Sequence, residues 1–179
     1  AVDSLDHKSK GWPHGQPDIL TKNEIAARQT IADFSLVGTR ELTADDYIYQ
    51  IKRLAHPRLH SPIFGMMADK IVGLKELGEN LQKAAKDKPA DEWLDLDAFP
   101  LSGVEKVDSH TWRVRIKGKY PQWSYWMQMT FLAPVPWEAD AFYAQPDMAA
   151  VGLSLDRWPV GTGAYMMTEF VQDRRHVME

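Results

Sequence analysis

The chain has 179 residues and a mass of 20.4 kDa, which is enough for about one globular domain. Apolar residues make up 44% and charged residues 26%, so a disordered, collagen-like or coiled-coil chain is excluded as a description of the whole. The formal net charge of −4 gives no basic footprint, and we expect no nucleic-acid partner. The chain contains no cysteine, which excludes disulfides, thiolate metal sites and cysteine nucleophiles.

Residues 1–20 mix charge, glycine, proline and histidine, which is typical of an irregular arm. Residues 25–31 fit a short helix, although residues 32–37 fit a strand equally well, and we interpret residues 1–40 together as an arm or connection. The sequence starts at Ala1 without an apolar segment, so we expect no signal peptide within it, and we expect a processed product or a piece of a longer protein. The longest charge-free run, residues 120–137, is broken by Pro134 and Pro136 and is not a credible membrane helix.

A first helix is predicted after Thr43, whose hydroxyl can cap free backbone N–H groups. Asp45 and Asp46 fall in its first turn, where the helix dipole favours negative charge. Pro57 requires the helix to end before it. The apolar residues at helical spacing are Tyr47, Ile48, Ile51, Leu54 and Ala55.

A second helix is predicted from Phe64 to about Lys83. The apolar stripe that supports it consists of Met67, Ile71, Leu74, Gly78 and Leu81. Residues 83–97 are polar and charged, which is typical of a solvated turn with a short surface helix.

A β-hairpin is predicted from residues 103–107 and 111–116, with a turn at residues 108–110. Its second strand alternates apolar and basic side chains, the period of a half-buried strand. The apolar members are Trp112, Val114 and Ile116, and the basic members are Arg113, Arg115 and Lys117.

Residues 120–143 hold 8 of the 19 aromatic residues of the chain. Pro121 suits the first position of a helix extending to Leu132, and a further helical turn is expected at residues 137–143. Apolar residues on all sides of residues 121–132 are typical of a buried core helix. The alternative is that Tyr125 or Trp126 lines a ligand cleft, because such rings combine contact area with a polar tip. If one side is uncovered, we expect self-association through Tyr125, Trp126 and Met129.

The C-terminal segment begins with a flexible loop, Gly161-Thr162-Gly163, which lacks the Gly-Lys-Ser/Thr ending of a phosphate-binding loop. We expect a structural crossing there, with backbone angles at Gly161 that only glycine adopts easily. A strand over residues 164–171 is expected to follow, anchored by Tyr165. A turn and a final strand complete the chain.

No catalytic or metal-binding constellation emerges from the sequence. His56 and His60 have the spacing of two metal ligands on a helix, but Pro57 between them makes that geometry inaccessible. No serine lies in a Gly-x-Ser-x-Gly elbow. We therefore expect no metal, no cofactor and no catalytic residue.

Four segments, in order, resemble one family. They are Glu41–Tyr49, Val104–Trp112, Ala133–Pro136 and Pro159–Tyr165. The last, Pro-Val-Gly-Thr-Gly-Ala-Tyr, is similar to a Pro-Val-Gly-Thr-Gly-Pro-Tyr signature, with Ala164 in place of the usual proline. The set resembles the extracellular solute-binding proteins of family 5, which serve ABC importers for peptides and related solutes.

The resemblance implies an α+β fold, a mixed small subdomain of the first lobe of a two-lobed, type II-like periplasmic binding protein. We expect residues 1–40 to form the connection, residues 41–165 the small subdomain, and residues 166–179 the start of return strands into the main lobe. The resemblance covers a middle stretch of the family, so this chain is expected to lack the second lobe and to bind ligand poorly by itself.

The resemblance also implies a function and a location. The chain is expected to be part of a non-enzymatic component that binds a small-molecule ligand, a peptide in the first instance, and delivers it to an ABC permease. The expected location is periplasmic or extracellular, in association with the membrane. Two alternatives remain open: a peptide-acting hydrolase, and a structural interaction domain without a small-molecule ligand.

Overall fold

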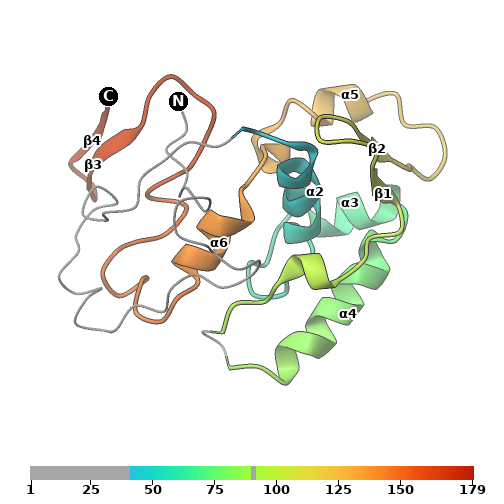
Figure 1. The fold of residues 1–179 in the computed structure, drawn as a ribbon, viewed down its shortest axis with the longest axis horizontal. Coiled ribbons are helices and arrows are strands. Elements are labelled where there is room, and N and C mark those ends of the chain that lie inside the picture. Colours follow the sequence, from blue (N-terminus) through green and yellow to red (C-terminus); the bar gives the residue numbers. More distant parts are fainter. Residues whose placement is uncertain (1–40, 90–91) are drawn as a thin grey trace. The chain divides into compact units, whose positions relative to one another are not determined.

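The computed structural model describes residues 41–89 and 92–179, which divide into two compact units (Figure 1). The helical unit contains residues 43–89 and 94–136, and the C-terminal unit contains chiefly residues 137–179. The expected arm, residues 1–40, lies outside the described residues. The expected subdomain, residues 41–165, spans both units, and its bounds stay a prediction.

The first helix, α2 (Ala44–Arg53), begins where the sequence predicts. The carboxylate of Asp46 accepts hydrogen bonds from the Thr43 backbone N–H at 2.9 Å and from the Thr43 hydroxyl at 3.4 Å. The helix thus starts with a capping box, in which Asp46 takes the place of the more common glutamate. Lys52 and Arg53 fall in the last turn, where the helix dipole favours positive charge.

The segment predicted as one helix forms two, α3 (Phe64–Lys70) and α4 (Leu74–Lys86), so that prediction was wrong. The predicted stripe nevertheless forms part of the core of this unit. Its members Met67, Ile71, Leu74 and Leu81 are fully buried. At Gly78 a methyl group would lie 2.5 Å from the ring of Phe64, so the glycine lets α3 and α4 approach closely.

The break between α3 and α4 coincides with a backbone bridge to a residue far along the chain. Ile71 is extended and forms an antiparallel bridge with Ile116. The N–H of Val72 donates to the carbonyl of Arg115 at 3.1 Å. Gly73 then adopts a φ of 81°, a left-handed conformation that turns the chain into α4.

The polar segment after α4 contains a short 3-10 helix, η2 (Leu96–Ala98). The ammonium group of Lys52, which is largely buried, donates to the carbonyl of Leu96 at 3.2 Å and to the carboxylate of Asp97 at 3.1 Å. An ion pair therefore joins the end of α2 to this segment. In this pair the Lys52 side chain is shielded from solvent and the Asp97 side chain is exposed.

The predicted hairpin is confirmed as β1 (Val104–Lys106) and β2 (Trp112–Val114), paired antiparallel with Val104 opposite Val114. The predicted alternation also holds, because the apolar members of β2 are half-buried and the basic ones are exposed. In Figure 1 the hairpin lies beside α2, and the contacts between them include a stack of Tyr47 on Trp112 at 5.7 Å.

The prediction of one helix from Pro121 to Leu132 was wrong. Only Trp123–Trp126 forms an α-helical turn, α5, and a 3-10 turn, η3 (Thr130–Leu132), follows it. Met129 between them is extended, with φ −84° and ψ 145°. Of the residues in these two turns only Leu132 is buried, so the segment is not a core helix.

The C-terminal unit contains the expected helix α6 (Trp137–Tyr143) and a second hairpin, β3 (Met167–Val171) with β4 (Arg175–Met178). A small core of Phe142, Met148, Leu153 and Trp158 lies between them, and Met167 and Phe170 pack against it. β3 begins at Met167 rather than at residue 164, although Met166 and Glu179 still exchange two backbone hydrogen bonds.

Tyr143 fastens α6 to the loop before β3. Its hydroxyl donates to the carbonyl of Trp158 at 2.7 Å. Burial raises the pKa of Tyr143 well above its ordinary value, so the hydroxyl stays protonated and keeps this bond. None of the helices in the described residues is long and apolar enough to cross a membrane.

Candidate functional site

The first candidate site is an aromatic surface on the helical unit, formed around α5 by Tyr120, Trp123, Tyr125, Trp126 and Met129. Tyr125 is 69% exposed and Met129 is 52% exposed, both high fractions for large apolar side chains. No residue of α5 is buried. The sequence prediction that named Tyr125 and Trp126 therefore identified residues that solvent can reach, but it placed them on a helix that does not form.

The rings of this aromatic surface support one another. Tyr120 and Trp126 meet edge to face with centroids 4.4 Å apart, and Trp123 lies 6.4 Å from Trp126. The ammonium group of Lys70 lies 5.1 Å from the centroid of Tyr120, a cation–π contact that fixes this ring against α3. Trp126 is thus a half-buried, positioned ring, and Tyr125 projects outward beside it. Such a surface can bind apolar or aromatic groups of a ligand.

The predicted loop at Gly161, Thr162 and Gly163 is exposed, as is Tyr165 at 73%. Gly161 does not have a positive φ, and a methyl group there would meet nothing within 4 Å. The expected need for glycine at this position is therefore not found. Tyr165 lies outside β3 and is too exposed to anchor it, so the expected anchoring role was wrong.

The second candidate site was missed by the sequence analysis. It is a hollow of about 520 Å³ at the turn between β3 and β4. Its lining is three arginines, a histidine, a glutamine, a phenylalanine and an aspartate, and the arginines are Arg157, Arg174 and Arg175. The signal that could have found it is the run Gln-Asp-Arg-Arg-His at residues 172–176, which we interpreted only as a turn and a strand.

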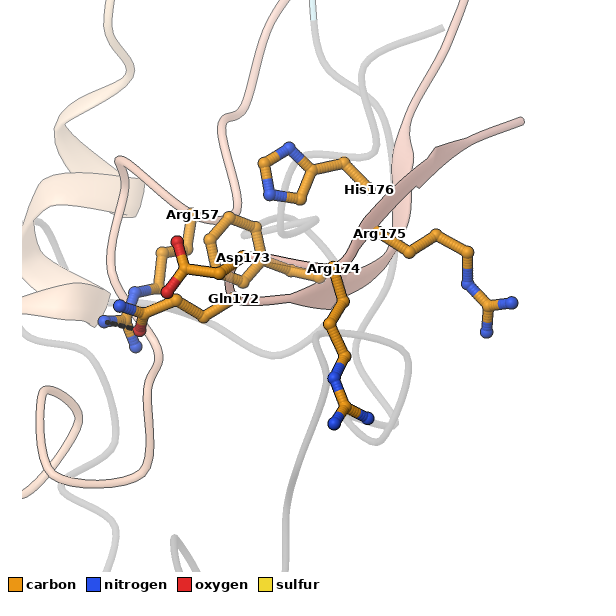
Figure 2. A pocket seen from close by; sticks show the side chains of 7 residues that line it. Arg157, Gln172, Asp173, Arg174, Arg175 and His176 are labelled. Atoms are coloured by element: carbon orange, nitrogen blue, oxygen red, sulfur yellow. Dashed lines mark hydrogen bonds between the residues drawn. The ribbon is translucent and has the colours of Figure 1, made fainter.

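Figure 2 shows Arg157 beside Gln172, whose side-chain oxygen accepts a hydrogen bond from the guanidinium at 3.4 Å. The guanidinium carbon lies 5.6 Å from the centroid of Phe170, and the ring of His176 stacks on the same phenyl ring at 4.5 Å. Phe170 itself packs on the core of the unit, so it provides a fixed base for both groups.

The remaining charges of the hollow differ in their surroundings. Figure 2 shows Arg174 and Arg175 extending in different directions from the turn. Arg175 pairs with Glu169 at 2.5 Å, and this hydrogen bond and charge raise the pKa of the guanidinium. Asp173, at the turn with a φ of 58°, is the one carboxylate of the lining.

The turn of the first hairpin brings a serine, a histidine and an aspartate together, which bears on the hydrolase alternative. The Ser109 hydroxyl lies 2.9 Å from Nδ1 of His110. The Asp108 carboxylate, however, accepts a hydrogen bond from the backbone N–H of His110 at 2.8 Å. In a catalytic triad the acid orients the imidazole itself. Here the Asp108 carboxylate instead stabilises a turn. Its hydrogen bonds with the backbone of His110 and with Thr111 lower the pKa of Asp108.

The two histidines considered as metal ligands lie in the loop after α2. Nδ1 of His56 accepts a hydrogen bond from the Arg58 backbone N–H at 3.2 Å, which turns this ring toward its own loop. His60 is exposed and has a φ of 47°. Within residues 41–89 and 92–179, no group of three or more histidine or acidic side chains is arranged to hold a metal ion.

Comparison with known families gives the class of this protein. The family described as bacterial extracellular solute-binding proteins, family 5 Middle, matches residues 38–179. The match covers well over half of the chain, so the chain belongs to this family, as the four segments predicted. Searches of curated proteins and of solved structures each returned no match.

Membership of the family has several direct consequences. Its members bind small-molecule solutes outside the cytoplasm, in the periplasm or the extracellular space, and deliver them to ABC importers. They are generally not enzymes. The mixture of helices and small sheets observed here is consistent with a domain piece of such a protein.

Proposed function

We propose that this chain is the middle part of a two-lobed solute-binding protein that captures short peptides for an ABC importer. The observation that carries the proposal is the family match over residues 38–179. The family description refers to a middle region, and the mixed α+β content agrees with a small subdomain of the first lobe. In the intact protein, ligand would be enclosed by closure of one lobe on the other.

The aromatic surface is the part of this chain that we assign to ligand contact. Tyr125 is exposed and ends in a hydroxyl, and Trp126 beside it is held by two further rings. A peptide offers alternating apolar side chains and polar backbone groups. Amphipathic rings suit both, because they supply contact area at a small cost in side-chain entropy.

The proposed location is the outer side of the cytoplasmic membrane, in association with it. The support is functional: a protein that delivers solute to a membrane permease works best where its local concentration near the permease is high.

Isothermal titration of the intact protein against short peptides, oligosaccharides and nickel chelates tests the proposal. We expect saturable binding of peptides, weakened about fivefold to tenfold by Tyr125→Ala because a contacting ring is lost. Tyr165→Ala is the matched control, since Tyr165 is equally exposed but lies in the other unit, and it should leave affinity unchanged. Binding of none of these solutes would refute solute capture. Equal effects of the two variants would refute the assignment of Tyr125.

The same aromatic surface supports a second proposal, that the isolated 179-residue chain self-associates through Tyr125, Trp126 and Met129. Two of these side chains are more than half exposed, and exposed apolar patches tend to find a partner. Light scattering over a range of concentrations should show a rising apparent mass. The double variant Tyr125→Ser, Met129→Ser should stay monomeric. A wild-type chain that is monomeric at every concentration would contradict this.

A further inference from the structure

We propose that the hollow between β3 and β4 binds a small organic anion that carries a carboxylate or a phosphate group. This site lies in the C-terminal unit, and it stands independently of solute capture at the aromatic surface.

The lining of the hollow carries an excess of positive charge. The lining holds three arginines against one aspartate, in a chain whose formal net charge is −4. Among the described residues, neither Arg157 nor Arg174 forms an ion pair with a carboxylate, whereas Arg175 is already paired with Glu169. The Arg157 guanidinium, which lies beside Gln172 in Figure 2, therefore favours an anionic occupant, because a guanidinium can form two parallel hydrogen bonds with a carboxylate or phosphate. Arg174 extends from the turn in another direction and adds positive charge to the surroundings.

Several polar groups of the hollow are positioned by their neighbours. The guanidinium of Arg157 is held by the side-chain oxygen of Gln172 and by the ring of Phe170. His176, stacked on the same ring, adds a further hydrogen-bonding group at the rim. Because Phe170 packs on the buried core, these groups keep their places without a ligand, and less entropy is lost when one binds.

The hollow is large enough for an organic ligand. A volume of about 520 Å³ is far more than one inorganic ion fills, and it lies within the range of about 300–1,000 Å³ that is typical of organic ligands. The hollow is also lined in part by apolar atoms of Phe170, which a bare ion cannot use. The proposed ligand therefore combines an anionic group with an organic body.

The test is an NMR titration of the isotope-labelled chain with four probes: phenyl phosphate, benzoate, inorganic phosphate and benzyl alcohol. We expect phenyl phosphate and benzoate to produce saturable shifts at residues 170–176, and the tighter of the two identifies the preferred anionic group. Inorganic phosphate should bind more weakly, and neutral benzyl alcohol should produce no saturable shift.

Two variants connect the binding to the hollow. Arg157→Gln should weaken binding of the preferred probe about tenfold, the loss expected for one charge-assisted hydrogen bond. Arg113→Gln is the matched control, because Arg113 is an exposed arginine of the first hairpin that pairs with Glu105 at 3.4 Å. It should leave the affinity unchanged. If Arg157→Gln disturbs the hairpin signals before probe is added, Arg174→Gln takes its place with the same expected direction.

Several results would overturn the proposal. They are the absence of saturable shifts with both organic anions, equal binding of benzyl alcohol, inorganic phosphate binding as tightly as phenyl phosphate, or equal losses in the variants of the hollow and in Arg113→Gln. None of these results would affect peptide binding by the intact protein, so failure of this site and failure of the proposed function are distinguishable.

Discussion

The two β-hairpins of this protein share an antiparallel design but are stabilised differently. The first, β1–β2, is joined to other elements through its backbone: the N–H of Ala44 donates to Ser109, and that of Val72 donates to Arg115. The second, β3–β4, is stabilised by its own ladder and by two side chains on a small core, and its turn carries the cationic hollow. The first hairpin is thus bonded to its neighbours through its backbone, whereas the second packs on its unit through side chains and has the hollow at its turn.

The largest expected effect is at Gly103, where the first hairpin touches the segment between α3 and α4. A methyl group there would lie 2.0 Å from the carbonyl oxygen of Val72, so the backbone must move. We expect Gly103→Ala to lower the free energy of unfolding by about 3 kcal/mol in urea denaturation.

The matched control for that substitution is Gly161→Ala in the C-terminal unit, where a methyl group would meet nothing. Its effect should stay within about 0.5 kcal/mol. Equal losses at Gly103 and Gly161 would contradict the close backbone approach between Gly103 and Val72.

The next largest effect is expected at Trp112, whose ring stacks on Tyr47 of α2. Because the side chain is half-buried, Trp112→Ala should cost about 2 kcal/mol, less than the truncation of a fully buried tryptophan. Met178→Ala on the exposed side of β4 should cost less than about 0.5 kcal/mol. Thermal unfolding of both variants checks this, and a larger loss at Met178 would reverse the comparison.

An intermediate effect is expected at Phe170, which joins the second hairpin to the core. Phe170→Ala should cost about 1–2 kcal/mol, because the ring is only partly buried. Phe170→Leu keeps most of the apolar volume but removes the ring on which His176 stacks. In NMR spectra the imidazole protons of His176 should therefore lose their ring-current shift in Phe170→Leu while stability is largely kept. An unchanged histidine spectrum would show that the stack does not form in solution.

The smallest effect is a pH dependence of the first hairpin. The N–H of His110, together with Thr111, lowers the pKa of Asp108 below its ordinary value of 3.8. The unfolded chain therefore binds this proton more readily, so the contribution of Asp108 to stability is present above about pH 4 and is lost as the pH falls through the folded-state pKa. Asp108→Asn should flatten this part of the stability–pH curve. An identical acid limb in both proteins would contradict the assignment.

The elements that the sequence predicted correctly are those whose signals are local. The limits of α2 were predicted from nearby residues, with Thr43 and Asp46 at its start and Pro57 after its end. The second strand was predicted from the alternation of apolar and basic residues between Trp112 and Lys117. The break between α3 and α4 had one local signal, Gly73, but a single glycine does not exclude a continuous helix, and the extended Ile71 pairs with Ile116, far along the chain. The apolar stripe therefore predicted which residues are buried, but it could not predict that the backbone leaves the helical conformation between Lys70 and Leu74.

The site residues were predicted in part. Tyr125 and Trp126 stood out because aromatic residues are concentrated in their segment, but their apolar surroundings favoured a buried helix. The α-helical turn ends at Trp126, the backbone at Met129 is extended, and Tyr125 is exposed. The hollow was missed because Arg157 is distant in sequence from residues 172–176. The two come together around Phe170, which packs on the core of the unit.

The measurement that tests solute capture at the aromatic surface most directly is hydrogen–deuterium exchange of the intact protein with and without a saturating peptide ligand. Our account predicts slower exchange over residues 123–132 in the presence of peptide, and no change over residues 104–114 of the first hairpin. A peptide that binds tightly while exchange over residues 123–132 stays the same would contradict it.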